Sequence, residues 1–335
     1  MKNLRYLIII LAVLFNSCAA SRISFNVLAP APVIIPNSVQ SIAIIDRSLP
    51  ENSDLNKIEG LLTGEGLEQD RLSTQFVIDG LNNSLSTTDR YTVMRTNELM
   101  VGSGSGFMFP EPLSWQEVEA LCVKYDVDAL VSLETYDSDF IVSSASSEGS
   151  ILNLRAGGEA TVNCGFRMYY PSRATIIDEF HFSHAMSWES GGSILAAANA
   201  VLNKNKAIRE TSFAAGNIYG QRITPAWYLV NRDYFKKSKR SPDLDMGARM
   251  MQLNDWDKAL ESLERSLEAG STKDRGRAAH NLAVVYEILG ELERAKEYTT
   301  LAWGRYKEKK SREYGYILTR RINDSLVLEN QLQKN

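Results

Sequence analysis

Residues 160–170 alternate apolar side chains with other side chains, and this pattern constrains the fold of the chain more than any other feature. The apolar positions are Ala160, Val162, Cys164, Phe166, Met168 and Tyr170. This period of two is typical of a half-buried antiparallel strand, because successive side chains of a strand point to opposite faces of the sheet. Pro171 to Arg173 supply a turn, and residues 176–188 return as the partner strand. The pattern therefore predicts a β-hairpin that buries one of its two faces.

Shorter strand-like and helix-like patterns surround this hairpin. Strands are predicted at residues 39–45, 91–94, 129–133 and 227–230, and helices at 70–85, after Ser114 and at 194–222. Ser114 and Glu117 have the spacing of a capping box, in which each residue satisfies a backbone N–H of the other. Strands that alternate with helices imply crossover connections. The order β-α-β-α-β-β-β-α-β therefore predicts an α/β domain with a mixed sheet over residues 39–240.

A repeat with an offset of 36 residues follows this region. The series Trp256, Ala259, Leu263 and Leu267 recurs as Leu292, Ala295, Thr299 and Trp303. Asn254 and Gly290 occupy the expected turn between the two helices of each unit. The pattern predicts an all-α domain of tetratricopeptide-like repeats over residues 241–335, and residues 312–331 would form a capping helix because helix pairs need neighbours to bury their apolar faces. A generic helical bundle is the alternative.

The N-terminus predicts export from the cytoplasm. Lys2 and Arg5 precede an apolar run from Leu7 to Phe15. Nine helical residues rise about 14 Å, roughly half the thickness of a bilayer core, so a signal peptide over residues 1–17 fits better than a membrane span.

The residues around Cys18 resemble the lipobox of bacterial lipoproteins, which implies that Cys18 is acylated and becomes the mature N-terminus. Phe15 and Asn16 depart from the commonest lipobox pattern, and an ordinary signal peptide with an incidental cysteine is the alternative. Residues 18–38 would form the lipidated N-terminus and an extended tether, because its prolines disfavour helix. In the lipoproteins that this segment resembles, acidic residues after the cysteine can direct display on the cell surface. No acidic cluster follows Cys18, so we expect a lipid anchor in the outer membrane of the cell envelope, on the periplasmic face.

Two further stretches resemble known envelope proteins. Asp89 to Val93 (DRYTV) and Tyr125 to Val131 (YDVDALV) resemble the curli-secretion lipoprotein fold, which also occurs in lipoprotein activators of penicillin-binding proteins and in the N-terminal domain of the Tol translocation protein. More closely, residues 59–65 (EGLLTGE) with Asp70-Arg71, and residues 232–235 (RDYF), resemble an uncharacterised bacterial lipoprotein family with a C-terminal tetratricopeptide segment. The broad resemblance covers residues 38–235 and implies a fold without an activity.

Composition argues against several classes of function. The chain has 37 Lys and Arg against 41 Asp and Glu, a net charge of −4 that gives no electrostatic reason to expect nucleic acid binding. Three cysteines and three histidines leave little material for a metal centre, and His181 and His184 would point to opposite faces of one strand. We expect no metal and no cofactor. Cys122 and Cys164 are expected to be buried thiols, with a disulfide between them as the alternative.

These patterns favour a membrane-anchored scaffold over an enzyme, and no catalytic residue is assigned. Other envelope proteins would bind in the groove of the repeats, and the acyl chains at the N-terminus would attach the protein to the membrane. Candidate partner-binding residues are His280, Asn281 and the acidic-loop residues Glu59, Glu65, Asp70 and Arg71. Two alternatives remain open: an envelope hydrolase or glycan-binding protein that uses loop 59–71, and a secretion-channel subunit with membrane hairpins from residues 136–191.

Overall fold

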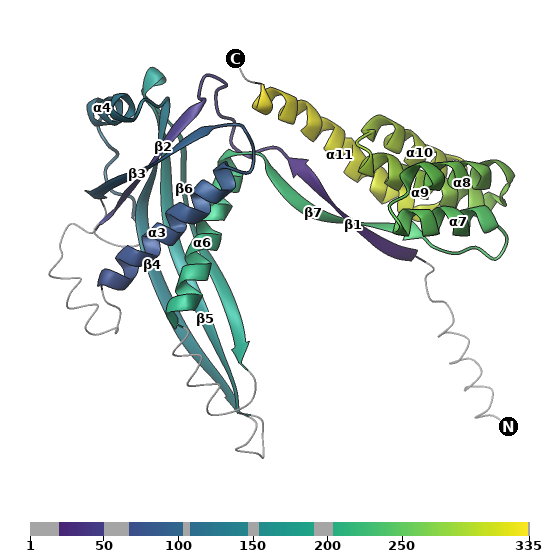
Figure 1. Ribbon diagram of the computed structural model, residues 1–335, viewed down its shortest axis with the longest axis horizontal. Helices are drawn as coiled ribbons and strands as arrows, with labels where there is room; N and C mark the ends of the chain where they lie inside the picture. The colour runs from purple at the N-terminus through teal and green to yellow at the C-terminus, as the bar shows by residue number, and fades with distance from the viewer. Residues whose placement is uncertain (1–19, 50–66, 103–107, 147–153, 191–203, 334–335) are drawn as a thin grey trace. The chain divides into compact units, whose positions relative to one another are not determined.

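The computed structural model divides the chain into two compact units (Figure 1). It describes residues 20–49, 67–102, 108–146, 154–190 and 204–333. One unit contains residues 30–226 together with the last described residues from Leu328, and the other contains residues 20–29 with 227–327. The signal peptide and Cys18 lie outside the described residues. The predicted order of a mixed α/β part followed by a helical region is confirmed.

The first unit is built on a five-stranded mixed sheet with the order β3-β2-β4-β5-β6. Its strands are β2 (Ser41–Leu49), β3 (Thr92–Val101), β4 (Ala129–Ser146), β5 (Leu154–Tyr170) and β6 (Thr175–Ser190). Strand β2 pairs in parallel with β3 and β4, whereas β5 pairs antiparallel with β4 and β6. The predicted hairpin turns at Pro171–Arg173.

Helices cover the two faces of this sheet. Helices α3 (Leu67–Leu85) and α6 (Lys204–Ile223) lie side by side on one face, and α4 (Trp115–Tyr125) packs on the other. Strand β2 shows the division, because Ile42 and Ile44 join the core under α3 and α6 while Ala43 and Ile45 join the core under α4. The connection from β2 through α3 to β3 and the connection from β3 through α4 to β4 run in opposite directions along the sheet, so crossovers of the same hand place these helices on opposite faces.

Glycine permits the close approach of α3 and α6. A Cβ atom on Gly80 would lie 1.9 Å from the carbonyl oxygen of Phe213, and one on Gly216 would lie 1.9 Å from that of Val77. No real Cβ contact is this short, so only glycine allows the two backbones to touch here. The predicted capping box of α4 is also confirmed, since Ser114 and Glu117 each bond the backbone N–H of the other.

The second unit begins with a two-stranded sheet that differs from the sequence prediction. Strand β7 (Ala226–Phe235) was expected in the α/β sheet, and residues 18–38 were expected to form a free tether. Instead β7 pairs with β1 (Ala20–Ala29). Hydrogen bonds from Arg22 to Asp233 and from Ser24 to Asn231 show that the two strands run antiparallel. An apolar pattern identifies a strand but not its partner, which explains the difference.

Five helices follow β7: α7 (Pro242–Gln252), α8 (Trp256–Ala269), α9 (Thr272–Ile288), α10 (Leu292–Gly304) and α11 (Lys309–Leu332). Their shared core includes Leu263, Leu282 and Ala295, and Ile23 of β1 and Tyr234 of β7 pack on it. None of the helices in the described part of the chain is long and apolar enough to cross a bilayer.

Candidate functional site

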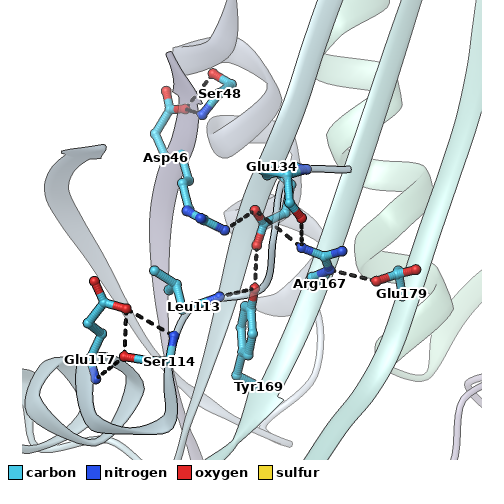
Figure 2. A network of polar contacts seen from close by, with 11 residues as sticks. Asp46, Ser48, Leu113, Ser114, Glu117, Glu134, Arg167, Tyr169 and Glu179 are labelled. Carbon is cyan, nitrogen blue, oxygen red and sulfur yellow. Dashed lines mark hydrogen bonds and ion pairs between the residues drawn. The ribbon is translucent and has the colours of Figure 1, made fainter. Parts of the chain in front are cut away.

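A buried carboxylate, that of Glu134, lies at the centre of a polar network in the first unit (Figure 2). Its side chain has no exposed surface. Oε2 accepts a hydrogen bond of 2.8 Å from Arg47 Nη1 and lies 3.9 Å from Arg167 Nη1, while Oε1 accepts a 2.7 Å bond from the Tyr169 hydroxyl. Both oxygens of this carboxylate are therefore engaged.

Strand register brings these four side chains together. Asp46 of β2 pairs with Leu133 of β4, so the next residues, Arg47 and Glu134, are neighbours across the two strands. A bulge after Leu133 shifts the register between β4 and β5. Arg167 and Tyr169 are two residues apart on β5 and therefore share a face of the sheet.

The network also holds the segment that precedes α4. Arg167 donates to the Pro110 carbonyl at 2.6 Å and to Glu179 at 2.6 Å, and Tyr169 Oη accepts a 3.3 Å bond from the Leu113 N–H. Burial, and next the charge of Glu134, raise the pKa of Tyr169 to about 12, so its hydroxyl remains a donor at neutral pH. The contacts of Glu134, Arg167 and Tyr169 thus join β2, β4 and β5 to the segment before α4.

The second unit contains a network of the same composition around Glu287 of α9. Arg232 of β7 donates to both carboxylate oxygens at 2.7 and 2.8 Å, and Arg321 of α11 donates at 2.6 Å. Tyr314 completes the set with its hydroxyl. Burial opposes ionisation of Glu287, but the hydrogen bonds from Arg232 and Tyr314 outweigh it and hold the pKa of this carboxyl below its usual value.

The surface position predicted for His280 and Asn281 is wrong. Both side chains are buried, with 2% and 0% exposure. His280 bonds Ser311 Oγ and the Asp233 carbonyl, each at 2.9 Å. The Asn281 amide accepts from the N–H of Phe235 and donates to its carbonyl, both at 2.8 Å. Helical spacing identifies the face of α9 on which these residues lie, but not that β7 covers that face.

The structure describes only part of the acidic loop, residues 59–71. Glu59 and Glu65 lie outside the described residues. Asp70 and Arg71 fall in the first turns of α3, and their side chains lie outside the described part of the chain. Their proposed roles in partner binding or catalysis stay predictions.

The alternative of a disulfide between Cys122 and Cys164 is wrong. Both thiols are free and buried, and they belong to the cores on opposite faces of the sheet. Burial raises the pKa of Cys122 to about 11 and raises that of Cys164 further, so neither is a reactive thiolate at neutral pH. Within the described ranges, no group of three His, Cys, Asp or Glu side chains could hold a metal ion.

An open hollow of about 460 Å³ lies between α8, α9 and α10. Its lining consists of Glu264, Tyr286, Arg294, Glu297, Tyr298 and Leu301. The rings of Tyr286 and Tyr298 stack with centroids 5.3 Å apart, and the Arg294 guanidinium lies 5.5 Å from the Tyr286 centroid. Burial, and next the charge of Glu264, raise the pKa of Tyr286. The hollow thus presents aromatic rings beside two carboxylates.

This hollow was not predicted from the sequence. Arg294, Tyr298 and Leu301 follow one another at intervals of four and three residues, the spacing of one helix face. That spacing was visible in the predicted second repeat. Only the packing of α8 and α9 shows that this face borders a concave surface.

Comparison with known families assigns more than half of the chain to one family. Residues 39–235, which span the five-stranded sheet, its helices and β7, match a family described as a domain of unknown function, DUF8603. The chain belongs to the DUF8603 family. Residues 245–323, which lie within α7–α11, match a second domain of unknown function, DUF6340. No curated protein matches the sequence.

Several solved structures are similar to this DUF8603 protein. The PelC dodecamer from Paraburkholderia phytofirmans is 9% identical, and the match covers 58% of this chain and 96% of that chain with a TM-score of 0.21. The hypothetical protein CT253 from Chlamydia trachomatis is 11% identical, with coverages of 53% and 96% and a TM-score of 0.21. Lipoprotein GNA1162 from Neisseria meningitidis is 14% identical, with coverages of 49% and 96% and a TM-score of 0.15.

TM-scores of this size do not establish a common fold, and they support no functional conclusion. Neither family model carries a curli-secretion or tetratricopeptide name. The resemblances to those families therefore stay predictions.

Substitution of the central carboxylate tests the first network. Glu134→Gln leaves the buried Arg47 without its carboxylate partner and leaves Arg167 paired with Glu179 alone, so we expect the free energy of unfolding to fall by about 3–5 kcal/mol. Urea denaturation at pH 7 measures this loss. The matched control is Asp79→Asn, which removes a partly exposed ion pair with Arg95 and should cost less than about 1 kcal/mol. Equal losses in the two variants would contradict a structural role for Glu134.

The burial of His280 predicts an acid-sensitive helical unit. Burial lowers the pKa of His280 from 6.5 to about 4, so the unfolded chain binds a proton in a pH range where the folded chain does not. This contribution to stability is complete above pH 6.5 and is lost as the pH falls towards 4. Between pH 7 and pH 4.5 it amounts to about 2–3 kcal/mol. Urea midpoints followed by far-UV circular dichroism should therefore fall less steeply with pH in His280→Gln than in the wild type. The same pH slope in both proteins would refute this assignment.

Proposed function

We propose that this chain is a lipid-anchored protein of the bacterial cell envelope that binds another envelope protein and catalyses no reaction. The observation that carries the proposal is the hollow between α8, α9 and α10, which offers a concave surface on a stack of helices. The anchor is supported by the basic residues, the nine-residue apolar run and Cys18 at the N-terminus.

Helices α7–α10 support a pair of tetratricopeptide-like units. Asn254 and Gly290, which are 36 residues apart, both have a left-handed backbone, with φ of 57° and 83°. Each is followed within two residues by a helix, α8 or α10, and Ala259 and Ala295 occupy equivalent buried positions in those helices. Equal turns and equal buried positions at a constant offset are what a repeat requires.

The chemistry of the hollow favours a basic side chain as the occupant. Glu264 and Glu297 are exposed carboxylates, and the two stacked tyrosine rings offer the π-faces that attract cations. A guanidinium of the chain itself, that of Arg294, already lies against Tyr286. A partner segment that carries Lys or Arg next to an apolar residue would meet Leu301 as well as the carboxylates.

The two buried networks are consistent with a role other than catalysis. Glu134 and Glu287 are each held by two arginines and one tyrosine, and neither keeps an oxygen free for a substrate. Their contacts join secondary structure elements, as a scaffold requires.

Site-specific photocrosslinking in cells tests partner binding. A photoreactive phenylalanine analogue at position 301 should form one dominant adduct, whereas the analogue at Thr300, an exposed position on another face of α10, should not. Adding Glu264→Gln and Glu297→Gln should reduce the adduct at least about fivefold, because two attractive charges are lost. Both glutamates are exposed, so the melting temperature should not change. An adduct that is equal at both positions, or that is insensitive to the double variant, would exclude the hollow as the binding surface.

A cysteine substitution tests the anchor separately. Cys18→Ala should abolish labelling by a radioactive or clickable fatty acid, and the chain should accumulate as an unprocessed precursor. The control Ser17→Ala keeps a small residue before the cysteine and should be labelled like the wild type. Labelling that persists in Cys18→Ala would rule out this attachment point.

A further inference from the structure

A run of cationic side chains follows β7 directly. Lys236, Lys237, Lys239 and Arg240 surround Ser238, with no carboxylate among them. Within the described ranges, none of these four side chains takes part in an ion pair or a side-chain hydrogen bond, and the last three are exposed. The whole chain has a net charge of −4, so this surface runs against the overall charge.

The surroundings hold the run in place without neutralising it. Ser238 donates from its N–H to Asp245 and from its hydroxyl to Asp274, both at 2.6 Å. Arg277 donates to the Lys237 carbonyl and lies over the Phe235 ring. Lys310 and Arg22 also lie here, and both pair with Asp233. The side chains named here are seven cations and three carboxylates, so positive charge is in excess among them.

The pairing of β1 with β7 places this surface next to the predicted anchor. Contacts of Arg22 with Asp233 and of Ser24 with Asn231 show that β1 runs antiparallel to β7, so the start of β1 lies near the end of β7. Cys18 precedes Ala20 by two residues, a length of chain that reaches at most about 7 Å. Lys236 follows Phe235 directly. If Cys18 is acylated, this short link keeps the start of the cationic run near the lipid headgroups.

We propose that the cationic surface, defined by Lys236, Lys237, Lys239 and Arg240, binds the anionic phospholipid headgroups of the membrane. The inference deepens the proposed function, because it rests on the anchor at Cys18 and supplies a second attachment beside it. A basic cluster combined with acyl chains is a stable way to hold a protein on a bilayer. Each Lys or Arg near an anionic surface strengthens partitioning about fivefold.

Vesicle binding by a chain without acyl groups tests the surface independently of the anchor. The chain of residues 18–335 with Cys18→Ala keeps every described element. It is sedimented at low salt with vesicles of phosphatidylcholine alone or with about one third phosphatidylglycerol. We expect binding only to the anionic vesicles, loss of binding at high salt, and a reduction of about a hundredfold or more in Lys236→Gln/Lys237→Gln/Lys239→Gln/Arg240→Gln.

A matched variant separates the local surface from the overall charge. Arg173→Gln/Arg249→Gln/Lys258→Gln/Arg320→Gln neutralises four exposed cations at other places, and its binding should fall less than about tenfold. Equal losses in the two quadruple variants, or equal binding to neutral and anionic vesicles, would overturn the proposal. Absence of binding to both vesicles would also overturn it and would favour an acidic protein segment as the ligand. Acyl labelling of Cys18 is unaffected by any of these outcomes, so failure of the surface and failure of the anchor are distinguishable.

Discussion

The buried carboxylate is the constraint on which both units of this protein depend. Glu134 and Glu287 have side chains without exposed surface, and a lone charge in such a place would be prohibitively unfavourable. Each unit satisfies it in the same way, with one arginine from one neighbouring element and an arginine and a tyrosine from another. The partners of Glu134 join β2, β4 and β5, and those of Glu287 join β7, α9 and α11. An arrangement that separated these elements would leave the carboxylate and its arginines without partners. The buried carboxylates therefore favour one arrangement of the elements around them.

The pairing of β1 with β7 changes how the anchor relates to the fold. A free tether over residues 18–38 would have let the folded part move away from the bilayer. Because β1 begins at Ala20 and pairs with β7, its first residue is only two positions after Cys18. The attachment we propose therefore holds the β1 end of the helical unit at the membrane, where the run Lys236–Arg240 also lies. The hollow between α8, α9 and α10 belongs to that same unit, so partner binding and membrane attachment would be carried by one compact body.

The candidate site shows the limit of reading one helix face at a time. His280 and Asn281 have the polar character and the helical position of a binding surface, yet β7 covers them and uses them as hydrogen-bond partners. Tyr298 and Leu301 had the spacing of one helix face and no obvious chemistry, yet they line the hollow. A polar residue on a helix can face solvent or a buried backbone. Asn281 faces a buried backbone because β7 covers it, and its hydrogen-bond partner Phe235 is 46 residues away in the sequence.

Local patterns in the sequence determined the order of elements over residues 39–240, the hairpin at Pro171, the capping box of α4 and the turns at Asn254 and Gly290. These features depend on residues that are close in the chain, through the period of a strand, a side chain that caps its own helix, or a backbone angle at a turn. The tertiary structure alone decided that β7 pairs with β1, that Cys122 and Cys164 face opposite cores, and that His280 is buried. Each of these depends on which distant surface covers a given face, because apolar burial is non-directional and the same strand or helix pattern is satisfied by many partners.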